Sequence, residues 1–250
     1  MIKNNNKKGQ VTIFILLGIV LVFTILVLSF IFGKDALNFF RSKDTYSEIS
    51  ECIGEVVQPA VNDLLKNGGI GNPAITIRYA GVNYTYLCYT KENFKNCYSI
   101  NPTPLTSVEK TLREKTVEEV KNCFTTSLKE LEKKGYTIDE QELEYSISFV
   151  PSSILVKINK KIAISKENSS QVFEDFSFEI KSKFYELLLL ANKIVDSNVK
   201  SCDFNYLAYT MFKRNYQITE KNFMGSKIYT ILEKSSNEEI KFAIRGCIYI

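Results

Sequence analysis

The chain has 250 residues, of which 45% are hydrophobic and 24% charged, and its net charge is only +4. These proportions are ordinary for a globular protein, so they exclude wholesale disorder, and the small, dispersed charge gives no footprint for nucleic acid. The absence of histidine excludes Ser-His-Asp and Cys-His catalytic systems as well as zinc sites with histidine ligands.

The first predicted element is a transmembrane helix. An uninterrupted apolar run, VTIFILLGIVLVFTILVLSFIF, extends from Val11 to Phe32. As a helix it would span roughly 33 Å, which is enough to cross a hydrocarbon core of about 30 Å. We therefore expect a cytoplasmic basic segment at 1–10, a juxtamembrane stretch at 33–46 and an extracytoplasmic domain at 47–250.

The entry to this run carries a resemblance. Lys7-Lys8-Gly9-Gln10, followed directly by the apolar residues, is similar to the class III signal of archaeal type IV pilin-like proteins. The resemblance implies cleavage between Gly9 and Gln10, with the apolar segment kept as an anchor or packed into a filament core. The chain departs from the pilin pattern at Phe14, where pilins usually carry glutamate.

A first helix of the domain is predicted over 47–66, and Gly68-Gly69 ends it. Pro59 predicts a kink or a break within this helix. The apolar residues that recur at helical spacing are Ile49, Ile53, Val56, Val57, Ala60, Val61, Leu64 and Leu65.

A tyrosine-rich β-hairpin is predicted next, with its turn near Gly81. Its alternating residues are Ile75, Ile77, Tyr79, Tyr84, Tyr86 and Cys88. Exposed tyrosine rings would form a binding surface, whereas cross-strand packing would bury them, and we favour packing.

A long helix follows from Thr106 or Ser107 to about Lys134, with Gly135 as its C-terminal cap. Its apolar face contains Leu112, Val117, Val120, Cys123, Phe124, Leu128 and Leu131. After it, alternating apolar residues predict an antiparallel meander of three strands at 143–149, 154–164 and 176–180, with a polar turn at 167–170.

The C-terminal part combines helices and strands. A helix is predicted over 182–198, and a second begins near Cys202 and carries Phe204, Leu207, Ala208, Met211 and Phe212. Strands are predicted at 216–223, 227–233 and 240–250, so the C-terminus should lie within a sheet. The predicted fold class is therefore α+β: a single N-terminal transmembrane helix, then an ectodomain of helices and antiparallel sheets.

All six cysteines follow the apolar run, and we expect them to form disulfides. Cys88 and Cys97 flank a short polar loop and form the simplest pair. Position in the chain pairs Cys52 with Cys123 and Cys202 with Cys247, although six cysteines allow 15 connectivities. Buried free thiols are the alternative, and zinc is disfavoured because no two cysteines are closely spaced.

The cysteines also decide the predicted orientation. Lys3, Lys7 and Lys8 precede the apolar run and Lys34, Arg41 and Lys43 follow it, so the positive charges are nearly balanced. Disulfides form in an oxidising exterior. We therefore expect a single-pass protein of the cell membrane with its C-terminal domain outside.

Taken whole, the chain resembles a group of membrane-anchored surface proteins of DPANN-type archaea. The similarity rests on four segments: KKGQVTIFILLG, SECIGEVV…KNGGI, EEVKNCF…KKGYTI and FEDFSFEIKSKF. It implies a location and a fold, and no activity.

No catalytic or cofactor motif is found. The gathered acids Asp139, Glu140, Glu142, Glu144, Glu174 and Asp175 would suit acid–base chemistry or calcium, but alternation with Leu143 and Tyr145 indicates the wet face of a strand. We therefore expect a structural, adhesion or appendage-assembly role, no cofactor, and the lipid bilayer and other surface or filament proteins as partners. An envelope enzyme or small-ligand receptor using carboxylates and tyrosines, and a pilin-like filament subunit, remain the alternatives.

Overall fold

The computed structural model describes residues 18, 20–24, 46–100, 105–166 and 169–246. The chain divides into two units, 1–49 and 50–250, and the description below concerns the second. Most of the predicted span 11–32, the processing residues Gly9 and Gln10, and Cys247 lie outside the described residues. Within the described ranges, no helix is both long and apolar enough to cross a membrane.

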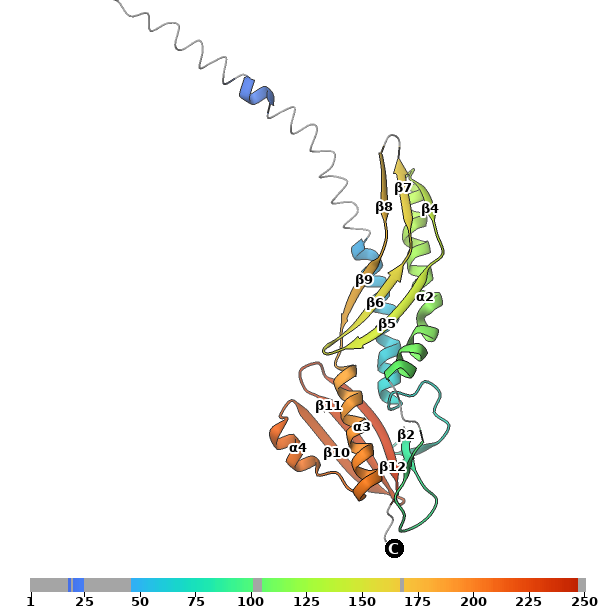
Figure 1. Ribbon diagram of the computed structural model, residues 1–250, viewed down its shortest axis with the longest axis vertical. Helices are drawn as coiled ribbons and strands as arrows, with labels where there is room; N and C mark the ends of the chain where they lie inside the picture. The colour runs from blue at the N-terminus through green and yellow to red at the C-terminus, as the bar shows by residue number, and fades with distance from the viewer. Residues whose placement is uncertain (1–17, 19, 25–45, 101–104, 167–168, 247–250) are drawn as a thin grey trace, which may run out of the picture. The chain divides into compact units, whose positions relative to one another are not determined.

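The fold class is α+β, as predicted (Figure 1). Apart from a short helical stretch at 20–24, the elements are the helix over 46–66, β1 (Thr76–Tyr79), β2 (Val82–Tyr89), β3 (Tyr98–Ser99), α2 (Leu105–Lys133), β4 (Thr137–Glu140), β5 (Glu144–Val150), β6 (Ser153–Asn159), β7 (Ile162–Lys166), β8 (Ser169–Phe173), β9 (Phe176–Lys181), α3 (Phe184–Ser201), α4 (Tyr206–Phe212), β10 (Tyr216–Phe223), β11 (Ser226–Glu233) and β12 (Glu238–Arg245).

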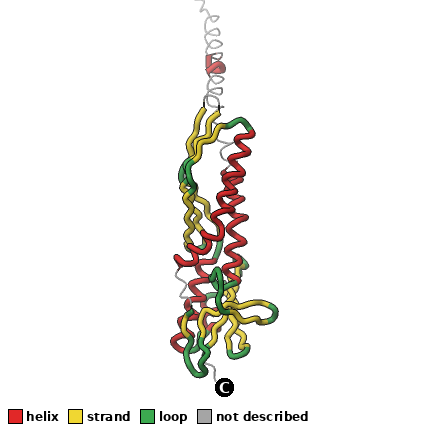
Figure 2. The backbone as a smooth tube through the Cα atoms, turned by 90° about the vertical axis from the view of Figure 1, so that its right-hand side faces the viewer, coloured by secondary structure: helices red, strands yellow, loops and turns green. Residues whose placement is uncertain are grey.

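We call the helix over 46–66, α2 and β4–β9 the meander half of the domain. Helices form one layer and strands the other (Figure 2). The apolar faces of both helices are buried as predicted, with Val57, Val61 and Leu112 fully inaccessible. The break expected at Pro59 is absent, because fully buried side chains on both sides of Pro59 hold the helix together to residue 66 despite the missing backbone donor.

The predicted meander is correct in topology and wrong in detail. The first and third strands are present as β5 and β9, but the second is split into β6 and β7, and with two further strands they form two sheets, β5-β6-β9 and β4-β7-β8. The long second strand is divided at Lys160-Lys161, and β4 and β8 were not predicted because Thr137–Glu140 and Ser169–Phe173 lack apolar alternation. They are strands because β7 pairs with both of them.

Lys160 lies in the gap between the two sheets. The apolar alternation Ile154, Val156, Ile158 continues to Ile162, and Lys160 takes the next inward position. Its side chain is buried, and its Nζ contacts Glu140 Oε2 at 2.8 Å and donates to the Gln141 carbonyl at 2.9 Å. Partners on the neighbouring strand therefore compensate the buried charge.

We call β1–β3, α3, α4 and β10–β12 the α3 half. Its main sheet has the order β1-β2-β12-β11-β10, with β3 paired to β2. Most pairs are antiparallel, but β12 runs parallel to β2, with Ala243 opposite Tyr86. The predicted strands at the C-terminal end are confirmed as β10, β11 and β12, and β12 lies inside the sheet; residues 247–250 are outside the described ranges.

Helix α3 covers one face of this sheet. Its buried stripe agrees with the prediction, and Phe184, Leu187 and Ile194 are fully inaccessible. The helix over 46–66 ends against α3, since a Cβ atom at Gly69 would lie only 2.8 Å from the Leu188 side chain. Gly68 and Gly69 both adopt positive φ, which confirms the predicted stop.

The tyrosine-rich hairpin, β1 and β2, forms one edge of this sheet. Its turn uses Ala80 and Gly81, both at positive φ, as expected for a tight hairpin. Tyr84 and Tyr86 are less than 9% exposed, and Tyr86 shares a 2.8 Å hydrogen bond with the Ser226 hydroxyl. The packing interpretation of these tyrosines is therefore confirmed.

Candidate interaction surface

Helix α4 is positioned by a tight corner after α3. Cys202 adopts φ = 61° and its N–H donates to the Asn198 carbonyl, which ends α3. Asn205 then caps α4, because its side-chain oxygen accepts a 2.9 Å hydrogen bond from the backbone N–H of Ala208. The predicted helix is confirmed, but it begins at Tyr206 and not near Cys202.

One side of α4 packs through Tyr209. Its ring lies 5.7 Å from the Phe204 ring and 6.4 Å from the Tyr216 ring, measured between centroids. Lys193 of α3 places its Nζ 5.0 Å from the same ring, a cation–π contact. Burial raises the pKa of Tyr209, so its hydroxyl stays neutral at physiological pH.

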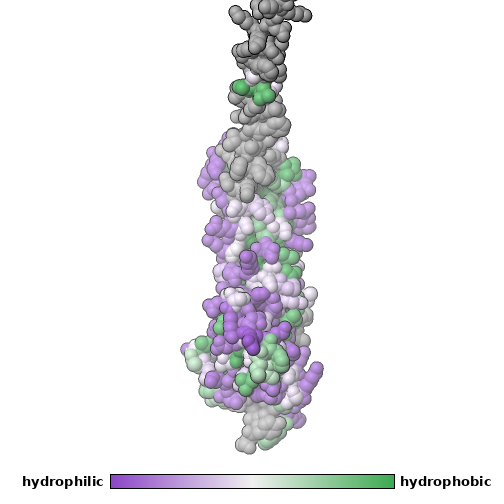
Figure 3. Space-filling model, turned by 90° about the vertical axis from the view of Figure 1, so that its left-hand side faces the viewer, coloured by the Kyte–Doolittle hydropathy of each residue, from purple (hydrophilic) through white to green (hydrophobic). Residues whose placement is uncertain are grey.

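The other side of α4 is apolar and exposed. Leu207 is 66% exposed, Met211 74% and Phe212 87%, and these three side chains are called the α4 patch below. At 3.6 residues per turn the three fall within an arc of about 140° on the helix surface, and Leu207 and Met211 are neighbours at i, i+4. In Figure 3, which faces the side where α4 lies, hydrophobic atoms gather among hydrophilic ones at the level of this helix.

Positive charge adjoins the patch. Lys213 and Arg214 follow α4 directly, and Lys234 reaches over to donate to the Arg214 carbonyl at 2.9 Å. No acidic residue occurs from Phe204 to Thr219. A pocket of about 540 Å³ opens here between Met211, Arg214, Lys234 and the start of β10.

Two of the three predicted disulfides are present. Cys52–Cys123 joins the helix over 46–66 to α2, with 5.8 Å between Cα atoms, and Cys88–Cys97 closes the loop between β2 and β3, with 5.4 Å. The third predicted pair includes Cys247, outside the described residues. The pair Cys202–Cys247 therefore stays a prediction.

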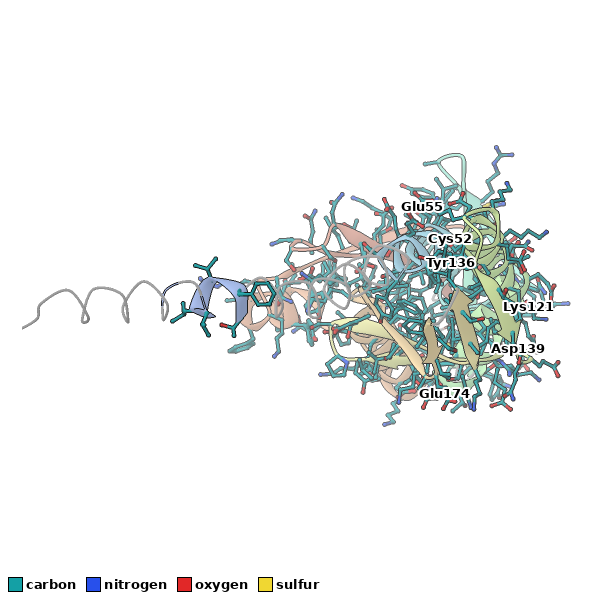
Figure 4. All side chains as sticks on the ribbon, turned by 90° about the horizontal axis from the view of Figure 1, so that it is seen from above. Cys52, Glu55, Lys121, Tyr136, Asp139 and Glu174 are labelled. Carbon is teal, nitrogen blue, oxygen red and sulfur yellow. A yellow bond between two sulfur atoms is a disulfide. The ribbon has the colours of Figure 1, made fainter. Side chains whose placement is uncertain are left out.

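The predicted acidic group does not converge. Glu140 pairs with Lys160 and Glu174 with Lys161, while Glu142 and Glu144 lie on the exposed face of the meander as predicted. Figure 4 shows Asp139 and Glu174 apart from each other at the periphery. Shallow pockets of about 580 and 510 Å³ at the strand interruptions mix these carboxylates with lysines. Among the described residues, no three side chains form a metal-binding group.

A serine–lysine pair was not predicted from the sequence. Ser152, at φ = 67° in the β5–β6 turn, accepts a 2.6 Å hydrogen bond from Lys183 Nζ and donates to Glu186 Oε1 at 3.1 Å. A serine nucleophile needs a neutral amine as its base. Here the Lys183 ammonium also pairs with Glu186 at 3.3 Å, so the cluster acts as a clamp between the turn and α3.

A second cluster fixes the start of α3 to β12. The Ser182 hydroxyl donates to Glu238 Oε1 at 2.6 Å and accepts from the Phe184 backbone N–H at 3.1 Å. The Lys183 backbone N–H donates to the other Glu238 oxygen. Only folding brings these residues together, more than 50 positions apart, and we find no sequence signal that would have shown it.

Comparison with known proteins adds no family to this picture: no protein-family model, no curated protein and no solved structure matches the chain. The α4 patch is therefore the candidate interaction surface on the strength of its own geometry.

Proposed function

We propose that the chain is a membrane-tethered protein whose residues 47–250 form a disulfide-stapled domain outside the cell membrane, with a structural, adhesive or appendage-assembly role. The observation that carries this proposal is the pair of disulfides, Cys52–Cys123 and Cys88–Cys97. Disulfides persist in oxidising compartments and are rare in the cytosol. The apolar run at 11–32 supplies the tether.

The surface supports an interaction role. The α4 patch exposes three large apolar side chains in one place, which is typical of a binding site. The acids that an enzyme would use are dispersed or paired with lysines, and the Ser152 hydroxyl contacts a lysine that is itself paired with a carboxylate. The proposed role needs no catalytic residue.

Intact mass spectrometry of the native protein, extracted from its own membranes without reductant, tests the proposal. We expect the mass to rise on reduction by about 6 Da, two hydrogens for each of three bridges. If the third predicted bridge also forms, alkylation before reduction should leave the mass unchanged. A full set of free thiols in the native protein would overturn the external location.

A pilin-like filament subunit is the second candidate, because of the entry Lys7-Lys8-Gly9-Gln10. The same mass spectrum tests it: loss of residues 1–9 supports cleavage between Gly9 and Gln10, and a full-length mass contradicts it. Phe14, in place of the glutamate usual in pilins, weighs against filament assembly.

A further inference from the structure

We propose that the α4 patch and its flanking cations Lys213, Arg214 and Lys234 bind the surface of an anionic lipid bilayer. This inference rests on the proposed function in one respect: the proposed tether keeps the domain close to a membrane. It adds a second lipid contact, made by the folded domain and independent of the apolar run at 11–32.

The apolar part of the surface has the form that a lipid interface accepts. Leu207, Met211 and Phe212 project from one side of α4, and Phe212 at 87% exposure is the most exposed large apolar side chain among the described residues. On the other side of the same helix, Tyr209 packs against the Phe204 and Tyr216 rings and so holds the helix in position. Insertion of such side chains at the boundary between headgroups and acyl chains removes them from water.

The charges beside the patch select the lipid. Lys213, Arg214 and Lys234 form no ion pair among the described residues, and the stretch from Phe204 to Thr219 contains no acid to repel phosphate. The carboxylates nearest in sequence have partners of their own: Glu233, next to Lys234, is buried and accepts from the Ser235 and Ser236 backbone N–H groups, and Glu220 accepts from the Tyr229 hydroxyl. Clustered lysine and arginine next to an apolar surface attract anionic headgroups.

A second copy of the chain fits this surface less well. A two-fold contact centred on α4 would place Lys213 and Arg214 of one copy against the same residues of the other, and like charges across an interface are unfavourable. The acid-containing pockets at the meander interruptions would be a heterologous partner, but Lys157 and Lys161 line them together with the carboxylates.

The chain contains no tryptophan, so a single introduced tryptophan reports on its own surroundings. We would place the full-length Phe212→Trp variant in nanodiscs of phosphatidylcholine, with and without phosphatidylglycerol, and measure quenching by brominated lipid. The matched control is Tyr98→Trp, at an exposed aromatic position on β3. Quenching at position 212 should rise at least about twofold with phosphatidylglycerol and fall in high salt, while position 98 stays unquenched.

Charge reversal makes the test specific. In the Phe212→Trp protein, K213E/R214E should abolish the gain from phosphatidylglycerol, whereas K213R/R214K should retain it. Equal quenching in both lipids, equal quenching at positions 98 and 212, or indifference to charge reversal would overturn the proposal. A blue shift of the emission without bromine quenching would also overturn it, because it would indicate a protein partner.

Failure of the tether is distinguishable from failure of this inference. If the chain does not enter nanodiscs, the proposed membrane anchor is wrong, and the same variants are then measured with added vesicles of the same lipids. Quenching at position 212 by anionic vesicles would still support the lipid contact, and its absence would refute the contact independently.

Discussion

The meander half and the α3 half cover the faces of their sheets in different ways. In the meander half, two helices cover one face of the strands, a disulfide links those helices, and the opposite face is polar. In the α3 half, one helix covers the sheet, tyrosines pack on part of the other face, and α4 leaves three apolar side chains in solvent. On the proposed function, we interpret the meander half as the more strongly stabilised part and the α4 patch of the α3 half as the contact surface.

The largest expected effect concerns the two disulfides, one in each half. Cys52–Cys123 spans 71 positions and Cys88–Cys97 only 9, so the first restrains the unfolded chain more. We expect the C52A/C123A variant to lose about 4 kcal/mol in free energy of unfolding and C88A/C97A about 2.5 kcal/mol. Urea denaturation of the full chain in mild detergent measures both, and a reversed order would contradict the assignment of stability to the meander half.

Glu233 provides the next effect, in the α3 half. Its burial by itself raises the pKa, but hydrogen bonds from Ser235, Ser236 and Asn215 outweigh burial and lower the pKa to about 2. Because the folded pKa lies below the ordinary 4.5, the stabilisation is complete above pH 4.5 and is lost as the pH falls toward 2.

Glu233→Gln should therefore lower the free energy of unfolding by up to about 3 kcal/mol at pH 7, and the difference from wild type should vanish near pH 2. Glu239→Gln, in the same hairpin but at a half-buried ion pair with Lys241, should cost less than about 1 kcal/mol. Unfolding curves at several pH values measure both variants. A loss for Glu233→Gln that does not depend on pH would contradict the mechanism.

Tyr145 gives a smaller effect in the meander half. Its hydroxyl shares a 2.9 Å hydrogen bond with Thr116, joining β5 to α2. Burial raises the pKa of Tyr145 to about 12, although the bond to Thr116 partly opposes this. Since the folded pKa is raised, the stabilisation is present below pH 10 and is lost as the pH rises toward 12.

Tyr145→Phe should cost about 1 kcal/mol near neutral pH, the value of one buried hydrogen bond. Because phenylalanine cannot ionise, this variant should lose less free energy of unfolding than the wild type as the pH rises from 10 to 12. Tyr98→Phe, at an exposed tyrosine, is the control and should change neither quantity. An unchanged alkaline transition in Tyr145→Phe would show that Tyr145 is not the group that titrates.

The smallest effect is expected at the α4 patch. M211S/F212S removes two exposed apolar side chains, so the free energy of unfolding should change by less than about 0.5 kcal/mol. Leu187→Ala, at a fully buried position of α3, should cost about 3 kcal/mol. Urea midpoints measure both variants. If the patch variant were as destabilised as Leu187→Ala, the interpretation of the α4 patch as a contact surface would be contradicted.

Much of the domain was predictable from short-range patterns. The buried stripes of the helix over 46–66 and of α2 and α3, the hairpin turn at Gly81 and the strand Tyr216–Phe223 are all encoded by spacing within one or two turns of the chain. The pairs Cys52–Cys123 and Cys88–Cys97 were also assigned correctly by position. The helices, the turn and the strand are predictable from the spacing of neighbouring residues, and the cysteine pairs from the order of the elements that carry them.

The candidate surface was predictable only in part. Leu207, Met211 and Phe212 were expected on a helix, and they are, but apolar periodicity cannot tell a side chain that faces a core from one that has no cover. The clamp between Ser152 and Lys183 and the attachment of the start of α3 to Glu238 depend on contacts between distant segments. No residue spacing in the sequence predicts these contacts.

By itself, the sequence determined the class of the domain, most of its helices and strands, and two of its cross-links, because these depend on local geometry and on burial of alternating apolar residues. Only the tertiary structure decided that the meander is interrupted at Lys160, that β12 lies parallel to β2, and that one side of α4 is left exposed. Those features depend on which distant segments meet. Lys160 meets Glu140, β12 pairs with β2, and one side of α4 stays uncovered only once the whole chain has packed.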